Sequence, residues 1–309
     1  MRIQNTLKNK ITFRGKGLHS GSMGNLTLQP APEDTGIVFV LKDGRQKQFI
    51  PYIPDNIIDT RNNITVSNGK ALVRTVEHLV AALYGMRVDN CLIETEMNEI
   101  PIMDGSALEF IEGIQETGVV EQDKEREELR IVNPVWVTSE DKFIVALPYN
   151  GLKLSYTISF PNSPIGTQTF NLDFSTESFL NKIAGARTFG FIEDLDYYRK
   201  NGLVLGGDFD NVHVFSRKEN RSLNSPRYDD EPVRHKVLDL VGGIAMLNFD
   251  IKAFIISYKG GHTLDTLFAQ RVMSTISGVQ KVGNVYSYGS DTNYYYMLAD
   301  ILDLEKYPS

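Results

Sequence analysis

The pair with the clearest chemical potential in this sequence is His235 and Asp239. They stand four residues apart in a segment, residues 233–241, whose apolar positions predict a helix ended by two glycines. Positions four apart lie on one helical face, so an imidazole and a carboxylate there could chelate a divalent metal. The same spacing is also typical of an ordinary polar helix face or a local ion pair, so the pair alone leaves both interpretations open.

Glu77 and His78 form a second candidate pair near the start of another predicted helix, residues 75–84. The apolar positions of this segment recur with helical spacing, and both polar residues fall beside that stripe, after Thr75 as the expected cap. In a metal site His78 would be a third ligand and Glu77 a base beside it. In the alternative, both belong to an exposed helix start, where glutamate favours the positive end of the helix dipole.

Two histidines and one carboxylate would leave a coordination position open, which is typical of catalytic rather than structural sites. The same ligand set also serves non-haem iron(II) oxygenases, so it does not select the metal. His262 follows a predicted strand and two glycines, where it could act as an acid or base or be a simple turn histidine. His213 lies among alternating residues and is predicted to be a strand residue rather than a ligand.

The elements that must position these side chains alternate between short strands and helices in both halves of the chain. Two halves of β-sheet plus helices predict an α+β protein with an internal structural duplication. A charge-rich stretch separates the halves, so we expect an N-terminal domain at 1–120, a linker at 121–130 and a C-terminal domain at 131–309. The predicted strands are residues 25–29, 36–41, 63–66, 90–96, 136–147, 152–160 and 253–258, with a hairpin turn at 148–151. The predicted helices are residues 75–84, 106–115, 177–184, 194–201, 233–241 and one that begins near residue 263.

Composition limits the class of protein. The chain has 309 residues, a formal net charge of −7 and 41% hydrophobic residues, which is enough for two packed cores and argues against disorder. An acidic chain is a poor nucleic-acid binder, because such binding depends on lysine and arginine. The one cysteine, Cys91, excludes internal disulfides and multi-cysteine zinc sites. No segment resembles a membrane span or a signal peptide, so we expect a cytoplasmic protein.

Five motifs, taken in order, resemble the UDP-3-O-acyl-N-acetylglucosamine deacetylase family of zinc amidases in lipid A synthesis. The motifs are Thr75-Val-Glu-His-Leu79, Ile100-Pro-Ile-Met-Asp-Gly-Ser106, Ala186-Arg-Thr-Phe-Gly190, Arg234-His-Lys-Val-Leu-Asp239 and Gly261-His262. The order and separations of the five motifs together indicate this family far more specifically than any one motif does. The resemblance covers essentially the whole chain and implies two domains of similar topology, each a β-sheet layered with two helices. The active site would lie in the cleft between them.

The resemblance also implies a metal site, catalytic residues and a reaction. The reaction would be hydrolysis of the acetamide of UDP-3-O-((3R)-hydroxyacyl)-N-acetylglucosamine. The metal, Zn²⁺ with Fe²⁺ as the alternative, would be bound by His78, His235 and Asp239. Glu77 would be the general base and His262 the general acid. Thr188 would donate a hydrogen bond to the oxyanion, and Lys236 would be the cation beside the intermediate or a substrate phosphate.

Substrate contacts are implied in the same way. The residues that would touch the substrate are Leu18, Phe189, Gly207 and again Lys236. An inserted segment near 190–215 would form a passage for the acyl chain, lined by Tyr197, Tyr198, Leu203, Val204 and Leu205. The implied protein acts on this UDP-linked substrate as a monomer, without nucleic acid and without a transmembrane segment.

One position departs from the family pattern. Where the family usually has an aspartate that hydrogen-bonds the catalytic histidine, this chain has Gly243. Without that charge the pKa of His262 should be lower, since a nearby carboxylate favours the imidazolium, and turnover should fall. Asp265, three residues after His262, is the partial replacement that the sequence offers. Two alternatives therefore stay open, an iron(II) enzyme with the same type of ligands and a low-activity or binding paralogue.

Overall fold

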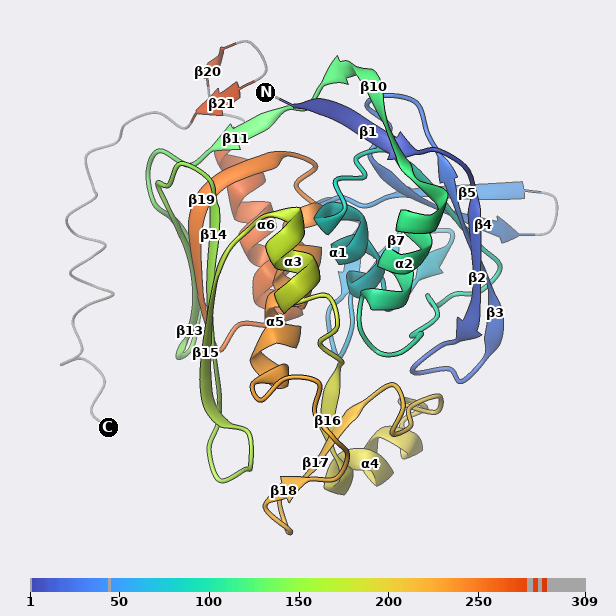
Figure 1. Cartoon of the computed structure of the whole chain (residues 1–309), viewed down its shortest axis with the longest axis vertical. Coiled ribbons are helices and arrows are strands. Elements are labelled where there is room, and N and C mark those ends of the chain that lie inside the picture. The colour runs from blue at the N-terminus through green and yellow to red at the C-terminus, as the bar shows by residue number, and fades with distance from the viewer. Residues whose placement is uncertain (1, 44–45, 277–279, 283–284, 288–309) are drawn as a thin grey trace.

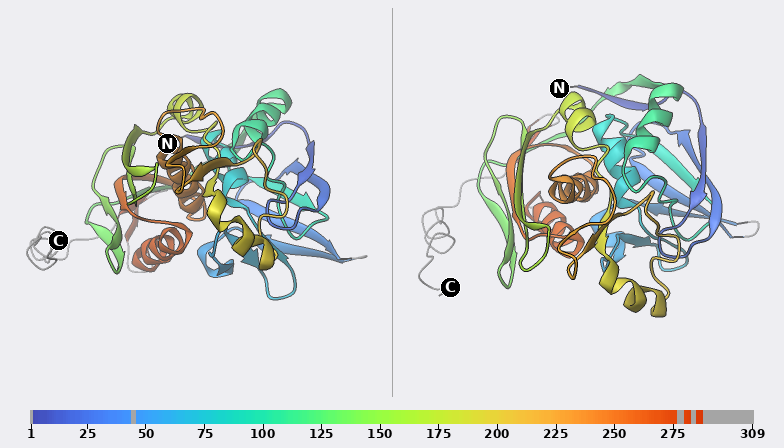
Figure 2. Two further views of the ribbon diagram at one scale, coloured as in Figure 1. Left: turned by 90° about the horizontal axis from the view of Figure 1, so that it is seen from below. Right: turned by 60° about the horizontal axis from the view of Figure 1, so that its bottom comes forward.

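The computed structural model describes residues 2–43, 46–276, 280–282 and 285–287. In this part of the chain the main helices lie between two β-sheets, one from the N-terminal half and one from the C-terminal half (Figure 1). Two further views show the same layers (Figure 2). The predicted α+β fold class is confirmed. No helix among the described residues is long and apolar enough to cross a membrane.

The first sheet has five strands in the order β2-β3-β9-β4-β5. Its inner side chains, such as Leu26, Leu28 and Ile93, are fully buried, because successive residues of a strand point to opposite faces. Two helices stand on the inner side, α1 (Glu77–Gly85) and α2 (Leu108–Thr117). The strands are β2 (Ile11–Lys16), β3 (Met23–Pro30), β4 (Ile37–Asp43), β5 (Gln46–Pro51) and β9 (Cys91–Thr95).

The second sheet has eight strands around the central strand β19 (Asp250–Tyr258). Three helices stand between it and the first sheet, α3 (Thr176–Lys182), α5 (Glu231–Ala245) and α6 (His262–Ile276). Helix α5 packs against β14 on one side and against α1 on the other, so the two halves meet along α1 and α5. The other strands are β11 (Glu128–Arg130), β12 (Val135–Ser139), β13 (Lys142–Leu147), β14 (Leu152–Phe160), β15 (Gly166–Asp173), β20 (Gln280–Val282) and β21 (Val285–Ser287).

Two predictions about the second sheet are wrong. Residues 136–147 are not one strand, because a turn at Glu140, with φ of 56°, divides them into the antiparallel pair β12 and β13. Residues 148–151 do not close a hairpin, because β19 lies between β13 and β14 and pairs with both. An alternating pattern identifies a strand but not its neighbour, which here comes from a distant part of the chain.

The charged segment 121–130, predicted as a linker, lies mostly in two strands. β10 (Val119–Glu125) pairs antiparallel with β1 (Ile3–Leu7), and β11 joins the second sheet. Most side chains of β10 are exposed, so the charges here mark a solvent-facing strand rather than an irregular connection. The domain boundaries at 120 and 131 stay a prediction, and residues 288–309 of the second domain lie outside the described part.

Helix α5 is longer than predicted and continues through Gly242 and Gly243 to Ala245, so the prediction that these glycines end it is wrong. A Cβ on Gly242 would lie 2.6 Å from the backbone oxygen of Glu77, and one on Gly243 would lie 2.9 Å from the Asp265 Cβ. The glycines therefore allow α1 and α6 to approach α5 closely. Their role is packing rather than helix termination.

A smaller group of elements, residues 189–222, projects from one end of the layers, at the bottom of Figure 1, and is called the arm. It contains a three-stranded sheet and a short helix, which confirms the strand at His213 and the helix near 194–201. Its elements are β16 (Phe189–Phe191), η2 (Ile192–Asp194), α4 (Leu195–Lys200), β17 (His213–Ser216) and β18 (Arg221–Ser222). The segment before α1 holds η1 (Pro54–Asn56) and a sheet of β6 (Ile57–Asp59), β7 (Thr65–Ser67) and β8 (Leu72–Val73).

Candidate active site between α1 and α5

The first turn of α1 carries Glu77 and His78, and both side chains are buried, so the alternative of an exposed helix start is wrong. The expected cap is wrong as well. Val76 is the residue before the helix, and Thr75 donates its hydroxyl to Glu99 Oε1 at 3.3 Å. Thr75 has φ of 56°, a strained conformation for a β-branched residue that its surroundings must impose.

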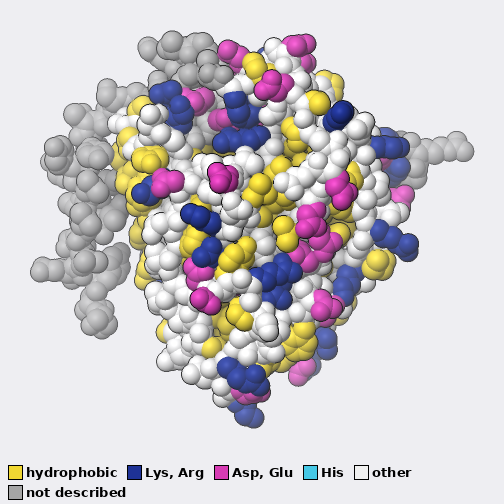
Figure 3. Space-filling view, in the orientation of Figure 1, with side chains coloured by type: hydrophobic (Ala, Val, Ile, Leu, Met, Phe, Trp, Pro, Cys, Tyr) yellow, Lys and Arg dark blue, Asp and Glu magenta, His cyan; other side chains and the backbone are white. Residues whose placement is uncertain are grey.

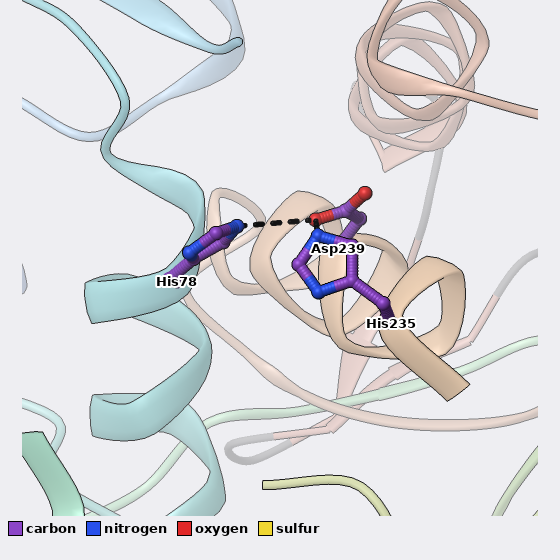
Figure 4. A group of neighbouring side chains, drawn as sticks. All are labelled: His78, His235 and Asp239. Atoms are coloured by element: carbon purple, nitrogen blue, oxygen red, sulfur yellow. Dashed lines mark ion pairs between the residues drawn. The ribbon is translucent and has the colours of Figure 1, made fainter. Parts of the chain in front are cut away.

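Helix α5 presents His235 and Asp239 toward α1, as their four-residue spacing predicts (Figure 4). His235 Nδ1 lies 3.0 Å from the carbonyl oxygen of Ala186, which places the proton on Nδ1 and leaves Nε2 free as a ligand. That Nε2 is 3.4 Å from Asp239 Oδ1, and His78 Nε2 is 3.8 Å from the same oxygen. The two imidazole rings meet edge to face with centroids 4.8 Å apart.

The three side chains fit a divalent metal ion. One ligand atom from each lies within 4.8 Å of the others, and all three residues are buried. Asp239 Oδ1 and His78 Nδ1 have no hydrogen-bond partner among the described residues. Burial lowers the pKa of His78 to about 3 and also lowers that of His235. Burial would raise the pKa of Asp239, but Lys236 and the histidines hold it well below its usual range. All three are therefore in the deprotonated form that metals require.

Glu77 and His262 flank this centre. Glu77 Oε2 accepts a hydrogen bond from the backbone N–H of Ile64 at 2.9 Å, and its Oε1 lies 3.8 Å from His262 Nε2. The same nitrogen is 3.9 Å from Asp239 Oδ2. Burial, together with the Asp239 charge, raises the pKa of Glu77 to about 8, and burial lowers the pKa of His262 to about 4. Strong shifts of this kind, in a cavity, are typical of groups that exchange protons during catalysis.

Lys236 is a largely enclosed cation beside the centre. Its Nζ donates to Asp239 Oδ2 at 2.6 Å. Burial would lower the pKa of Lys236, but the charge of Asp239, supported by Tyr156 and Asp265, raises it above its usual range. The ammonium therefore stays charged and faces the same space as the three candidate ligands.

Thr188 is held by backbone hydrogen bonds on both sides. Its N–H donates to the Gly105 oxygen, and its carbonyl oxygen accepts from the N–H of His213, both at 2.8 Å. The buried carboxylate of Glu231 binds the backbone N–H of Arg187 at 3.0 Å and its guanidinium at 2.9 Å, and it lies 3.1 Å from His213 Nδ1. This ion-paired cluster fixes the segment around Thr188 against the start of α5.

One cavity of about 530 Å³ connects the centre with the arm. All the residues predicted for the site line it, although they come from six separate stretches of sequence and from both halves of the chain. They are Leu18, Glu77, His78, Thr188, Phe189, Gly207, His235, Lys236, Asp239 and His262. The fold thus brings together every predicted site residue, and their individual roles stay predictions.

The arm supplies the apolar end of this cavity, with Phe191, Leu195 and Val214 among its lining residues. Of the five side chains predicted for the acyl passage, only Tyr198 and Val204 line the cavity. Tyr197 is 67% exposed, and neither Leu203 nor the exposed Leu205 belongs to the lining. The sequence of the six-residue helix α4 does not indicate which of its side chains face the cavity. On the face of the molecule shown in Figure 3, hydrophobic side chains are scattered among charges of both signs.

Several other residues that the sequence motifs did not indicate also line the cavity, among them His19, Phe160 and Gly260. His19 is buried, both of its ring nitrogens lack a partner among the described residues, and burial lowers its pKa. Glu99 accepts the backbone N–H groups of His19 and Ser20 at 2.7 and 2.8 Å and so fixes this turn. The only signal in the sequence was a histidine placed between closely spaced glycines.

Known proteins resemble this chain over most of its length. A sequence model of the LpxC family, described as UDP-3-O-acyl N-acetylglycosamine deacetylase, matches residues 4–274. Three curated relatives are named UDP-3-O-acyl-N-acetylglucosamine deacetylase. The Oleidesulfovibrio alaskensis protein is 41% identical over 269 residues, 87% of this chain and 88% of the relative. The Thioalkalivibrio sulfidiphilus protein is 42% identical over 275 residues (86% and 90%), and that of Bdellovibrio bacteriovorus is 36% identical over 282 (91% and 93%).

Proposed function

This chain belongs to the UDP-3-O-acyl-N-acetylglucosamine deacetylase family, a family of hydrolytic enzymes, and on that premise we propose its reaction. The enzyme would hydrolyse the acetamide of UDP-3-O-((3R)-hydroxyacyl)-N-acetylglucosamine to the free amine and acetate, the committed step of lipid A synthesis. The observation that carries the proposal is the buried group of two histidines and one aspartate on facing helices, with Glu77 and His262 beside it.

The donor set supports a resident divalent ion held by His78, His235 and Asp239. When bound, such an ion supplies Lewis acidity and lets water act as a nucleophile at neutral pH. Lys236 occupies Asp239 Oδ2, so the carboxylate would offer the ion its other oxygen, which is unpartnered among the described residues. Two imidazoles and one carboxylate suit Zn²⁺, which we propose, with Fe²⁺ as the alternative.

Glu77 and His262 would carry the two proton transfers. Beside a bound divalent cation the pKa of Glu77 would fall from the value of about 8 that burial gives it, and the Glu77 carboxylate would then take a proton from the attacking water as a C–O bond forms at the acetyl carbon. The negative charge of the intermediate would favour the imidazolium of His262 over the neutral ring that burial favours, and Nε2 would then give a proton to the amide nitrogen as the C–N bond breaks, so that acetate and the amine leave. The hydroxyl of Thr188 would donate to the oxyanion, a contribution on the order of 3 kcal/mol.

Lys236 would act on the intermediate rather than on the distant diphosphate. Its ammonium is bound to Asp239 and largely enclosed, so it can reach negative charge that develops at the centre but little beyond it. Leu18, Phe189 and Gly207 would contact the sugar and the first part of the acyl chain, whose remainder would enter the arm. A local cation at the centre would attract an anionic substrate despite the overall charge of −7.

Acetate release from UDP-3-O-((3R)-hydroxyacyl)-N-acetylglucosamine tests the function. We expect purified wild-type protein to release acetate, a chelator to abolish the release, and added Zn²⁺ or Fe²⁺ to restore it. The variant Glu94→Gln, altered on the face of β9 that points away from the helices, is a matched control that should keep full activity. A wild-type protein loaded with metal that releases no acetate above background would overturn the proposal. Oxygen consumption without acetate release would favour the iron(II) oxygenase instead.

Three broader expectations belong to the same proposal. The two halves of the chain would act as domains that form the two walls of the cavity, since its ligands come from both. The enzyme would work as a monomer, because residues of one chain complete the predicted site. We expect the reaction in the cytoplasm, as predicted from the sequence.

A further inference from the structure

Asp265 is a buried carboxylate to which none of the steps above assigns a task. It lies in the first turn of α6, is 1% exposed, and neither of its oxygens has a hydrogen-bond partner among the described residues. Burial raises its pKa to about 8, although the nearby charge of Lys236 acts in the opposite direction, so the carboxyl group needs a further positive partner to be ionised at neutral pH. An unpaired acceptor in the core costs stability that an apolar residue would not, so its presence needs a reason.

The neighbouring helix keeps room for this carboxylate. Gly243, in the interior of α5, faces Asp265, and a Cβ at Gly243 would lie 2.9 Å from the Asp265 Cβ. Glycine inside a helix lowers its stability, so the space at this position is maintained at a cost. A substitution Gly243→Asp would crowd Asp265 rather than simply add a second carboxylate. Gly243 and Asp265 therefore form a complementary pair, with space on α5 and charge on α6.

The Nδ1 atom of His262, on the same turn of α6, is another buried polar atom without a hydrogen-bond partner among the described residues. Nε2 of the same ring faces Glu77 and Asp239. His262 and Asp265 are three residues apart in the helix and so share one face. An imidazole that gives a proton from Nε2 needs an acceptor at Nδ1, which fixes its orientation and stabilises its positive charge.

The other titratable groups around the pair come from three directions. Glu77 lies on α1, Tyr52 follows β5 and Tyr156 lies on β14, and α5 carries His235, Lys236 and Asp239. Among them, Tyr52 donates its hydroxyl to the Gly242 oxygen at 2.9 Å, and Lys236 is bound to Asp239. The carboxylates of Glu77 and Asp239 lie on the Nε2 side of His262. That leaves Asp265 as the carboxylate available to Nδ1.

We propose that Asp265 is the positioning residue of His262. Its carboxylate, turned toward Nδ1 in the space beside Gly243, accepts the Nδ1–H and stabilises the imidazolium until Nε2 has given its proton to the leaving nitrogen. The proton on Nδ1 of His262 is not transferred to Asp265 in this hydrogen bond. Asp265 contacts neither the substrate nor the metal. This inference rests on the proposed deacetylase function, because it assigns His262 the role of general acid.

Histidine-selective ¹⁵N NMR tests the contact without measuring activity. Zn²⁺-loaded wild type, Asp265→Asn and Thr266→Val are compared, with His262→Gln to assign the signal. Thr266 is the matched control, since it is the next residue of α6 and its buried hydroxyl also lacks a partner among the described residues. We expect the His262 proton on Nδ1 in wild type, a lower His262 pKa in Asp265→Asn and no change in Thr266→Val. The same His262 shifts and pKa in wild type and Asp265→Asn would overturn the proposal.

Kinetics provide a second readout. We expect Asp265→Asn to lower kcat about ten- to hundredfold, as for the loss of a hydrogen bond to a charged group, with KM nearly unchanged. The basic limb of its pH–rate profile should move to lower pH, whereas Thr266→Val should keep the wild-type profile. A uniform loss of rate at every pH would indicate a structural role and contradict the proposal. Absent acetate release from wild type would instead contradict the proposed function, and the NMR comparison would still decide the contact.

Discussion

The candidate metal centre, formed by His78, His235, Asp239 and their neighbours, lines the same cavity as the arm but is built in a different way. The centre takes its side chains from α1, α5 and α6, helices packed between two sheets, and nearly every group in it is buried and shifted in pKa. The arm consists of short strands and the six-residue α4, and its side chains range from buried Phe191 to the largely exposed Tyr197.

This difference matches the two demands that the proposed reaction makes. Proton transfer and metal binding need side chains held in fixed positions away from water, which rigid helices in a core provide. An acyl chain makes only apolar contacts, which tolerate adjustment of short surface elements. Changes at the centre should therefore affect all substrates equally, whereas changes in the arm should alter the preference among acyl-chain lengths.

Removal of a metal ligand should have the largest effect. We expect Asp239→Ala to lose bound metal and acetate release for every acyl length, because it deletes a ligand and leaves the Lys236 ammonium without its partner. Metal analysis of the purified protein and a discontinuous acetate assay measure both losses. Asp141→Ala, which removes an exposed partner of Lys259, is the control that should retain both. Full metal content in Asp239→Ala would contradict the assigned ligand set.

Glu77→Gln should be nearly as damaging while the metal stays bound. We expect kcat to fall about 10²- to 10⁴-fold, the usual contribution of a positioned general base. Metal content should equal that of wild type, since Glu77 is not among the three candidate ligands. The fall should be the same for short and long acyl chains. A fall in kcat for only one acyl-chain length would contradict the different roles assigned to the centre and the arm.

Gly190→Leu should have a smaller and selective effect. Gly190 lines the cavity, and a Cβ added there would meet no atom within 4 Å, so the larger side chain would fill open space. We expect kcat/KM for long acyl chains to fall about tenfold relative to short ones, a usual cost for misfit of one or two methylenes. Gly190→Ala should give an intermediate result, and Tyr197→Ala, outside the lining, none. Equal losses at all lengths would show that Gly190 does not contact the chain.

The smallest effect concerns the stability of the metal-free protein. The pKa of Glu77 is raised from 4.5 to about 8, so between these values the folded state binds more protons there than the unfolded chain. By linkage, this residue lowers stability progressively as the pH rises through that window. Glu77→Gln should therefore exceed wild type in Tm by a margin that grows from pH 5 to 8 and reaches a few degrees.

Thermal unfolding in chelator at several pH values measures this margin. Glu94→Gln is the control, because ion pairing with Lys42 and Lys47 lowers the pKa of Glu94 and it is already ionised throughout this range. Its margin should stay constant. A constant margin for Glu77→Gln as well would contradict the burial-raised pKa.

Local pattern was enough to identify the candidate side chains of the site, and the resemblance to a family then implied their roles. The spacing of His235 and Asp239, and the position of His78 after an apolar stripe, depend only on helix periodicity, which operates over a few residues. Three of the five strands of the first sheet, β3, β4 and β9, and the helices α1, α2 and α3 were predicted within a few residues for the same reason. The strands β2 and β5 were not predicted. The motifs then specified a family, and the fold brings all the predicted site residues to one cavity.

Tertiary structure alone decided what depends on contacts between distant residues. Three features are examples. β19 lies between β13 and β14, α5 continues through Gly242 and Gly243, and Tyr198 rather than Tyr197 lines the cavity. Each of these choices is set by packing against a surface that no local sequence window contains. The packing of Asp265 against Gly243 is also of this kind, because only the close approach of α6 to α5 shows why position 243 has a glycine.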